Sequence, residues 1–315
     1  MKWNVILAAC IIAMSAVSYA KGSKKDWPLD EKVLDNVLIS QLDCGGWGKN
    51  MDKSKPFDAK KREKVLSRKD HADSATIDNG ATTTEIRYLL KYNAQKPDSS
   101  ALASAEKGIR WLLASQLPNG GWPQFPERKK GYWTQITFND NAMRNVLLLL
   151  REASRGEGDF AVLPEELRQA CGKAFEKGLD CTLKCQIKVD GKPTVWCQQH
   201  DRETLEPAGG RAYEFPSFCS QESAEMVLFL MSLDNPSPEV KAAIDGAVEW
   251  FRKSRLEDGT WARFYDLKEC RPFFCDRTGE PKRSIDEIEP ERRKGYSWFN
   301  KKGAMVLKKA DKKAK

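Results

Sequence analysis

Two polar pairs at the starts of expected helices have the residue types of a site for a hard cation. Asp78-Asn79 precedes one helix, and Asn139-Asp140 begins the next. Asp and Asn often cap helices, and capping is the simpler interpretation of either pair alone. Two pairs at equivalent places of successive helical units instead favour one shared cleft. Carboxylate and amide oxygens without histidine suit calcium better than zinc.

A second set of residues could bind planar anions. Among the arginines of the segments 196–218 and 261–300, four form a candidate set, namely Arg211, Arg263, Arg271 and Arg277. A lone arginine is ordinarily a surface ion pair. These four are interleaved with the aromatic residues Tyr213, Phe264, Tyr265, Phe273 and Phe274. Because arginine binds carboxylates bidentately and stacks on aromatic rings, the two sets together predict an acidic polysaccharide as ligand.

The elements that must position these residues are repeated. Four related segments end in Gly-Trp or a close variant, at residues 41–47, 116–122, 186–196 and 255–261. An amphipathic run precedes each of them, which indicates a helix. The glycines supply the positive φ that ends a helix, and we expect the tryptophan to fill the turn against the neighbouring helix.

The repeats predict three helical hairpins, roughly 82–116, 140–186 and 219–255, after a lead-in helix near 30–42. Thr82 to Glu85 has the pattern of a capping box at the start of the first hairpin. The fold class is therefore mainly α, an α/α toroid with short β-strands in its long connecting loops. The loops 47–81, 122–139, 196–218 and 261–300 should gather at one mouth. Terpene cyclases and glycan-processing enzymes share such hairpins, so the fold alone does not decide the function.

Charge is unevenly distributed along the chain of 315 residues, whose net charge is +8. Lys2 is the only charge in residues 1–20, and seven lysines against Asp311 give residues 301–315 a charge of +6. The body, 21–300, is therefore almost neutral at +1. Its ordinary composition excludes a disordered chain and a multi-span membrane protein, and its neutrality argues against nucleic acid as a partner.

The two ends predict processing and location. Residues 1–20 have the pattern of a signal peptide ending in Ser18-Tyr19-Ala20, which predicts a secreted or periplasmic protein that is not stably inserted in a membrane. A lipobox at Leu7 to Cys10 is the minor alternative. We expect a catalytic domain at 21–300 and a solvated, flexible Lys-rich tail at 301–315. The eight cysteines that remain in an exported chain favour disulfides, with a zinc site at Cys181 and Cys185 as the rival interpretation.

Six segments resemble the pectate lyases of polysaccharide lyase family 10. They are residues 77–84, 118–125, 137–143, 195–201, 261–265 and 289–298, and the likeness extends over about 27–299. The resemblance implies a helical α/α toroid that cleaves polygalacturonate by calcium-assisted β-elimination. We expect the protein to be a monomer. The greater number of cysteines, the early motif Gly46 to Asn50 and a short link between Arg211 and Arg263 depart from the family pattern.

The resemblance also implies roles for single residues. Asp78 and Asp140 would hold calcium, with Asp78 also facing the substrate. Arg211 and Arg263 would bind substrate carboxylates, and Arg277 would be the catalytic base. An arginine base implies an alkaline pH optimum, because its pKa lies above about 12.

Two other functions remain open at this stage. A hydrolase on the same toroid could use Asp78 and Asp140 as acid and base. A non-catalytic pectin-binding protein could present the same grooves. Only the lyase forms an unsaturated uronide that absorbs ultraviolet light.

Overall fold

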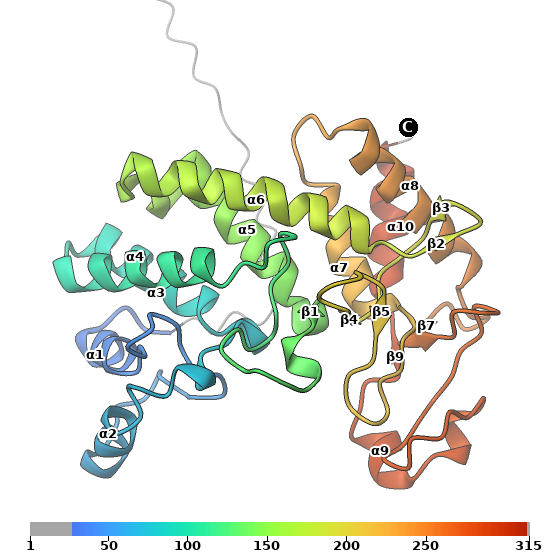
Figure 1. Cartoon of the computed structure of the whole chain (residues 1–315), viewed down its shortest axis with the longest axis horizontal. Helices are drawn as coiled ribbons and strands as arrows, with labels where there is room; N and C mark the ends of the chain where they lie inside the picture. Colours follow the sequence, from blue (N-terminus) through green and yellow to red (C-terminus); the bar gives the residue numbers. More distant parts are fainter. Residues whose placement is uncertain (1–26, 314–315) are drawn as a thin grey trace, which may run out of the picture.

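The computed structural model describes residues 27–313 (Figure 1). The expected signal peptide at 1–20 and the lipobox at Cys10 lie outside the described residues. The α-helices are α1 (Glu31–Ile39), α2 (Ala59–Leu66), α3 (Thr83–Gln95), α4 (Ser99–Ala114), α5 (Ala142–Arg155), α6 (Glu165–Cys185), α7 (Ser220–Leu230), α8 (Pro238–Lys253), α9 (Pro290–Lys294) and α10 (Lys302–Lys313).

Short strands and 3₁₀ turns lie between these helices. The strands are β1 (Ile136–Thr137), β2 (Lys188–Val189), β3 (Lys192–Pro193), β4 (Gln199–His200), β5 (Pro207–Ala208), β6 (Phe218–Cys219), β7 (Trp261–Ala262), β8 (Phe264–Tyr265) and β9 (Phe299–Asn300). They pair antiparallel in the orders β1-β4-β5, β2-β3, β6-β8 and β7-β9. The 3₁₀ turns η2 (Asp78–Gly80) and η4 (Asn139–Asn141) precede α3 and α5.

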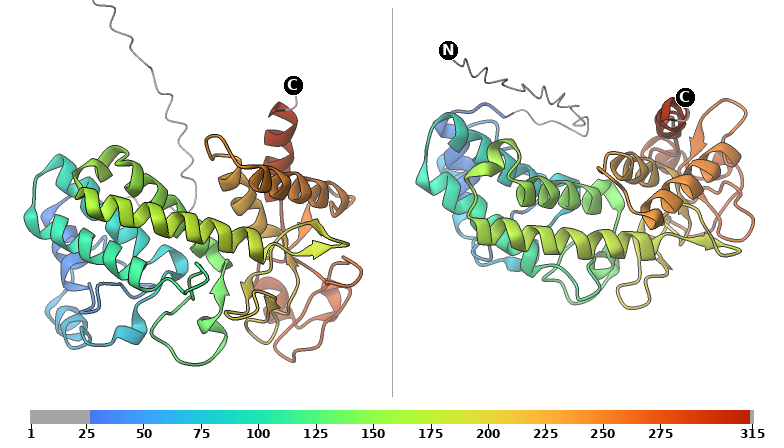
Figure 2. Two further views of the ribbon diagram at one scale, coloured as in Figure 1. Left: turned by 45° about the horizontal axis from the view of Figure 1, so that its top comes forward. Right: turned by 90° about the horizontal axis from the view of Figure 1, so that it is seen from above.

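The three expected hairpins are confirmed as α3–α4, α5–α6 and α7–α8. Successive hairpins pack so that α3, α5 and α7 form one layer and α4, α6 and α8 a second. Figure 2 shows them side by side along the long axis of the molecule. In α5 the apolar residues Met143, Val146, Leu147 and Leu150 recur at helical spacing and are fully buried. The fold class predicted from the repeats, an α/α toroid, is thus the one observed.

The tryptophan of each repeat does what its motif predicts. All four indoles are fully buried, and each donates its Nε1–H to a carbonyl near the end of the preceding helix at 2.7–2.9 Å (Trp47 to Val37, Trp122 to Leu112, Trp196 to Thr182, Trp261 to Phe251). For Trp47, Trp122 and Trp261, a glycine of a neighbouring helix leaves room for the ring. A Cβ on Gly178 of α6, for example, would stand 2.7 Å from the ring of Trp122.

The C-terminal segment corrects the expectation of a solvated, flexible tail. Residues 302–313 form α10, which packs against α7 and α8. Gly303 lies on the ring of Trp261, and Val306 is fully buried. The Lys313 ammonium donates to the carbonyl of Met231 at 3.0 Å, at the C-terminal end of α7. The lysines that suggested a free end are the polar side of an amphipathic helix, so the folded domain continues to residue 313.

Replacing Val306 with aspartate is expected to lower the free energy of unfolding by roughly 3 kcal/mol or more, because it buries a carboxylate among apolar side chains. The neighbouring Met305 is 48% exposed, so Met305→Asp is the matched control and should change stability little. Urea unfolding of both variants measures the difference. Equal, small effects would show that α10 is detached in solution, as the sequence suggested.

The capping box predicted at Thr82 to Glu85 does not form. Thr82 has φ 64° and does not cap α3 with its side chain. Its hydroxyl instead accepts the N–H of Trp47 at 3.0 Å, and Glu85 pairs with Lys53 at 2.8 Å. The capping box therefore does not form, because both polar side chains have tertiary partners.

The cysteines also differ from expectation. All eight in the described residues are free thiols, so no disulfide is formed there. Cys181 and Cys185 follow each other on one face of α6 with their sulfurs 4.0 Å apart. Within residues 27–313 no group of three or more His, Cys, Asp or Glu side chains is placed to hold a metal, so the zinc interpretation has no support.

The long loops gather as expected. The loops around α2, before β1, around β4–β5 and around α9 all extend to the same side of the helical layers, the lower side in Figure 1. The Asp190-Gly191 turn joins β2 to β3 with positive φ at both residues, as a tight hairpin requires. Among the described residues, no helix is both long and apolar enough to span a bilayer.

Candidate active site

A repeated backbone hydrogen bond aligns the loops where they return to the helices. In the first three repeats the residue that closes the loop donates its N–H to the carbonyl of that repeat's tryptophan, at 3.1, 3.1 and 2.9 Å (Thr76 to Trp47, Thr137 to Trp122, Cys219 to Trp196). Three positions later in the sequence stand Asn79, Asp140 and Glu222. The repeat geometry therefore places one polar residue of each hairpin at an equivalent position after its loop.

The turns η2 and η4 lie against each other and carry the predicted carboxylates. Asn79 and Asp140 have φ of 51° and 50°, a left-handed conformation that Asn and Asp tolerate best. Asp78 is 1% exposed, accepts the N–H of Asn79 at 3.0 Å and forms an ion pair with Lys49. Neither Asp78 nor Asp140 caps the helix that follows, so the capping interpretation is wrong for both.

Neighbouring carboxylates disfavour the charge of Asp140. Asp140 stands at the exposed edge of the site, yet desolvation by the surrounding loops, followed by the nearby carboxylates of Asp78 and Glu222, raises its pKa to about 6. A cation between Asp78 and Asp140 relieves that repulsion. Calcium takes six to eight oxygen ligands, more than two carboxylates supply. The residues thus fit a calcium ion that is shared with an anionic ligand rather than enclosed by protein alone.

Arg211 is held by Glu214, three residues later in the same loop. The Nε of Arg211 and its backbone N–H both donate to Glu214 Oε2 at 2.9 Å, and its Nη2 pairs with Oε1. Burial opposes the charge of Arg211, but the carboxylate outweighs burial and raises the pKa of the guanidinium above its usual range. Arg211 therefore stays a cation that can bind an anion with its free edge.

Arg263 is held in the same way by a residue from another repeat. It is 5% exposed, and its Nη2 donates to Glu222 Oε1 at 2.6 Å. Burial again opposes the charge, and Glu222 again raises the pKa of the guanidinium above its usual range. With its amide oxygen turned toward Arg263 Nη2 at 2.8 Å, Gln198 donates to Glu214 Oε1 at 3.2 Å and joins the two arginine sites.

Tyrosine rings connect the arginines. The guanidinium carbons of Arg263 and Arg211 lie 4.6 and 5.5 Å from the ring centroid of Tyr296. That of Arg277 lies 5.9 Å from the ring of Tyr213. Such stacking fixes the planes of the guanidinium groups.

The predicted residues fall into three groups by position: inside the site, at its rim and outside it. Asp78, Asp140, Arg211 and Arg263 come together: the charge of Arg263 acts on Asp140, and those of Arg211 and Asp78 both act on the hydroxyl of Tyr132. Arg277 stands at the rim, 67% exposed in its side chain, with Glu291 at 3.5 Å. Arg271 lies outside the site and pairs with Glu269 at 3.3 Å.

Several residues of the site were missed from the sequence, namely Lys49, Tyr132, Gln198, Glu214, Glu222 and Tyr296. Glu214 carried a detectable signal, because a carboxylate three residues from an arginine in a short loop can close back on it. Glu222 could have been found by aligning the third repeat with Asp140. The partners of Tyr296 and Lys49 are distant in sequence, so no local pattern indicated them.

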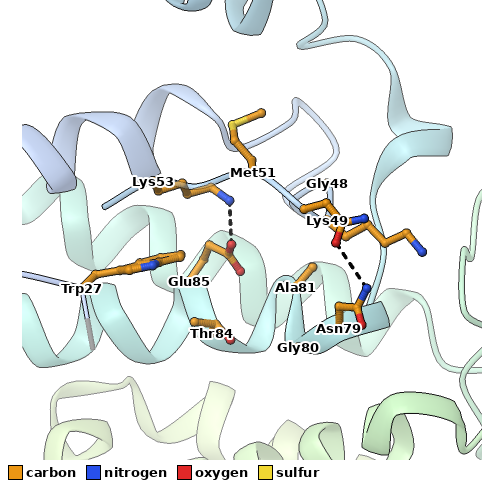
Figure 3. Close-up of a pocket in the computed structure, with 11 residues that line it drawn as sticks. Trp27, Gly48, Lys49, Met51, Lys53, Asn79, Gly80, Ala81, Thr84 and Glu85 are labelled. Atoms are coloured by element: carbon orange, nitrogen blue, oxygen red, sulfur yellow. Dashed lines mark hydrogen bonds and ion pairs between the residues drawn. The ribbon is translucent and has the colours of Figure 1, made fainter. Parts of the chain in front are cut away.

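A small polar cavity adjoins Lys49 (Figure 3). Its volume is about 30 Å³, enough for about one water molecule, and Asn79, Lys53 and Glu85 are among its walls. Glu85 Oε2 is buried without a hydrogen-bond partner among the described residues, which a water in this cavity would satisfy.

His200 does not provide a base. It is fully buried, its Nε2 accepts the N–H of Cys197 at 3.0 Å, and its Nδ1 lies 2.8 Å from the carbonyl of Leu205. Burial lowers its pKa to about 4. The imidazole therefore stays neutral and serves the loop structure.

The pKa of His200 predicts acid sensitivity. The unfolded chain binds a proton at this residue near pH 6.5 but the folded chain only near pH 4, so folding stability falls as the pH drops through that range. Between pH 7 and about pH 4.5 we expect a loss of roughly 2.4 kcal/mol from His200. Urea unfolding of His200→Gln should show a weaker pH dependence than that of His71→Gln, which alters an exposed histidine. Identical pH dependence in the two variants would contradict the assignment.

Comparisons with known proteins agree on one family. The family described as pectic acid lyase matches residues 41–260 and 255–307. The structure is similar to the family 10 polysaccharide lyase from Cellvibrio cellulosa, with a TM-score of 0.81 and 32% identity over 91% of this chain and 93% of that one. A mutant of the same enzyme, in complex with trigalacturonic acid, gives a TM-score of 0.82 and 31% identity over the same shares. No curated protein sequence matches the chain.

The residues matched by the family include the loops that carry Asp78, Asp140, Arg211 and Arg263, and the solved structures cover 91% of this chain. The chain therefore belongs to the pectic acid lyases of polysaccharide lyase family 10.

Proposed function

We propose that this lyase cleaves polygalacturonate by β-elimination, with calcium shared between Asp78, Asp140 and a uronate carboxylate, and with an arginine as the base. One observation carries the proposal: two mutually repelling carboxylates lie beside two arginines that buried carboxylates keep charged. The trigalacturonic acid bound to the mutant relative supports an acidic oligosaccharide as the ligand.

The reaction removes the proton at C5 of a galacturonate and expels the glycosidic oxygen at C4. Bound calcium would supply Lewis-acid stabilisation of the carboxylate next to C5, whose negative charge otherwise makes that proton weakly acidic. Arg211 and Arg263 would bind substrate carboxylates through the guanidinium edges that Glu214 and Glu222 leave free. Their fixed planes orient the sugar before the proton is transferred.

Arg277 remains our candidate for the base. Arg211 and Arg263 are each tied to a buried carboxylate that stabilises the protonated form, which suits anion binding and opposes proton abstraction. The partner of Arg277, Glu291, is 62% exposed in its side chain and 3.5 Å away, so water screens the pair. An arginine base implies that activity rises toward alkaline pH.

Export and a monomeric state complete the proposal. The apolar segment and the cleavage pattern in residues 1–20 support removal of a leader and a secreted or periplasmic enzyme. Asp78, Asp140, Arg211 and Arg263 all come from repeats of one chain, so the proposed site needs no second copy.

A spectrophotometric assay on polygalacturonate, with calcium and with EDTA, tests the proposal. We expect calcium-dependent formation of an ultraviolet-absorbing unsaturated uronide. New reducing ends without that absorbance would indicate a hydrolase. Retention on immobilised polygalacturonate without cleavage would indicate a binding protein.

The ion pair of Lys49 with Asp78 predicts competition for the metal site. The ammonium occupies a carboxylate that calcium needs, so Lys49→Gln is expected to bind calcium several-fold more tightly. Terbium luminescence, with calcium as competitor, measures this affinity without turnover. Lys55→Gln removes the same charge from an exposed position of the same loop and is the matched control. Unchanged or weaker calcium binding in Lys49→Gln would show that the two cations do not compete.

A further inference from the structure

The loop between the second Gly-Trp motif and β1 holds an arginine between two aromatic rings. The guanidinium carbon of Arg128 lies 3.8 Å from the ring centroid of Phe125 and 4.8 Å from that of Trp133. Its Nε donates to the carbonyl of Asp73 at 3.2 Å. Among residues 27–313 its terminal nitrogens have no hydrogen-bond partner and no carboxylate lies within ion-pair distance. The group is thus fixed in its plane while its anion-binding edge is free.

A short series of contacts connects Arg128 to the carboxylates. The ring of Phe125 faces Arg128 on one side and lies 5.4 Å from the ammonium of Lys49, which pairs with Asp78. Trp133 is 4.8 Å from Tyr132 between ring centroids. Arg128 therefore belongs to the same mouth as the proposed reaction centre, but to a different loop from Arg211 and Arg263. In Figure 1 this loop (green) lies between the blue segment around α2 and the yellow loop between β4 and β5.

The stacking favours ligand binding over a purely structural role. An arginine that only stabilises a loop ordinarily donates hydrogen bonds to a carboxylate or to several carbonyls. Its five N–H donors are costly to leave without acceptors. Arg128 uses one of them on the protein, and its side chain is half-buried. A planar guanidinium that is already ordered loses little entropy when it binds a carboxylate. The half-exposed ring of Trp133 adds an apolar face for a sugar.

We propose that Arg128, held between Phe125 and Trp133, binds the carboxylate of a galacturonate unit distant from the cleaved bond and so forms an outer subsite for long acidic oligosaccharides. This inference rests on the proposed function, because it takes the polyanion to lie across Asp78 and Asp140. The subsite adds binding energy only for chains long enough to reach it. It contributes to the affinity and not to the chemical step.

Arg128→Gln tests the subsite through chain length. On hexagalacturonate we expect KM to rise roughly ten-fold with kcat unchanged, since a charge-assisted bidentate contact is lost. On trigalacturonate we expect less than a two-fold change. Lys129→Gln removes the same charge from the next, exposed residue and should leave both substrates unaffected. Arg128→Lys keeps the charge but loses the planar fork, and should raise KM for the hexamer by an intermediate factor.

Calorimetric binding of hexagalacturonate to the same variants, in EDTA, gives a second readout independent of turnover. Weaker hexamer binding in Arg128→Gln alone supports the subsite even if the wild type forms no unsaturated product, in which case only the proposed reaction fails. Equal losses on trimer and hexamer, no loss on either, or the same loss in Lys129→Gln would each overturn the subsite. Thermal unfolding of each variant checks that the loop is still folded.

Discussion

Replacing Asp78 with asparagine is expected to lower kcat/KM on polygalacturonate by at least about 10³-fold, and EDTA should do the same to the wild type. Asp78 is the more buried of the two carboxylates, and its only ion-pair partner among the described residues is Lys49. Asparagine keeps the shape and removes the charge, so the loss reports metal binding rather than packing. A Lewis acid that stabilises developing charge contributes several kcal/mol, which corresponds to this factor.

The effect of Asp78→Asn has a matched control close by. Asp73 is an exposed carboxylate in the preceding turn, and Asp73→Asn should retain wild-type kinetics. Excess calcium should restore the EDTA-treated wild type but not Asp78→Asn. Wild-type activity that survives EDTA, or equal activities of the two variants, would exclude a metal at Asp78.

The second large effect concerns the arginines. Arg277→Lys is expected to lower kcat by about 10²–10⁴-fold with little change in KM, because the shorter side chain ends in a tetrahedral ammonium and cannot place a nitrogen at the same point. Arg211→Lys and Arg263→Lys should mainly raise KM, since each loses the fork that binds a carboxylate. Initial rates of unsaturated product at several pH values separate kcat from KM.

The outcome of this series decides between the candidates for the base. Arg271→Lys, on the same long loop but outside the site, is the control and should leave kcat and KM unchanged. Full kcat in Arg277→Lys together with its loss in Arg211→Lys would transfer the role of base to Arg211. Loss of kcat in Arg263→Lys alone would assign that role to Arg263.

The two central arginines follow one electrostatic pattern. Arg211 has Glu214 behind it and Arg263 has Glu222, and both carboxylates are buried. Each carboxylate compensates the cost of desolvating its arginine and fixes its direction. In the proposed reaction the remaining edges would meet the anionic ligand, and the carboxylates Asp78 and Asp140 would provide the place for a cation.

Much of the fold could be predicted because its determinants are local. The spacing of Met143, Val146 and Leu150 predicts an amphipathic helix without any tertiary information. The glycines and tryptophans of the four motifs predict where helices end. The same reasoning wrongly predicted that the C-terminal segment, which forms α10, is a flexible tail. Its exposed lysines outnumber the residues that bury the helix, Gly303 and Val306.

The predicted disulfides and the capping box failed for a related reason. The number of cysteines and the predicted export said nothing of the distances between thiols, and all eight thiols in the described residues are free. Thr82 and Glu85 have the residue types of a cap, but Trp47 and Lys53 bind them more favourably once the chain is folded. Local patterns name a possible partner, and tertiary contacts select the actual one.

For the site, the sequence by itself predicted that the pairs Asp78-Asn79 and Asn139-Asp140 would face one mouth, because they occupy equivalent positions of a repeat. It predicted the same for several arginines because they lie in the long loops. Only the tertiary structure decided that Glu214 and Glu222 hold Arg211 and Arg263 charged, that Arg271 lies elsewhere, and that Arg128 lies between the rings of Phe125 and Trp133. The physical reason is the sequence distance over which each interaction acts. Helix periodicity depends on residues only a few positions apart. Electrostatic pairing and ring stacking act between atoms that only folding brings together.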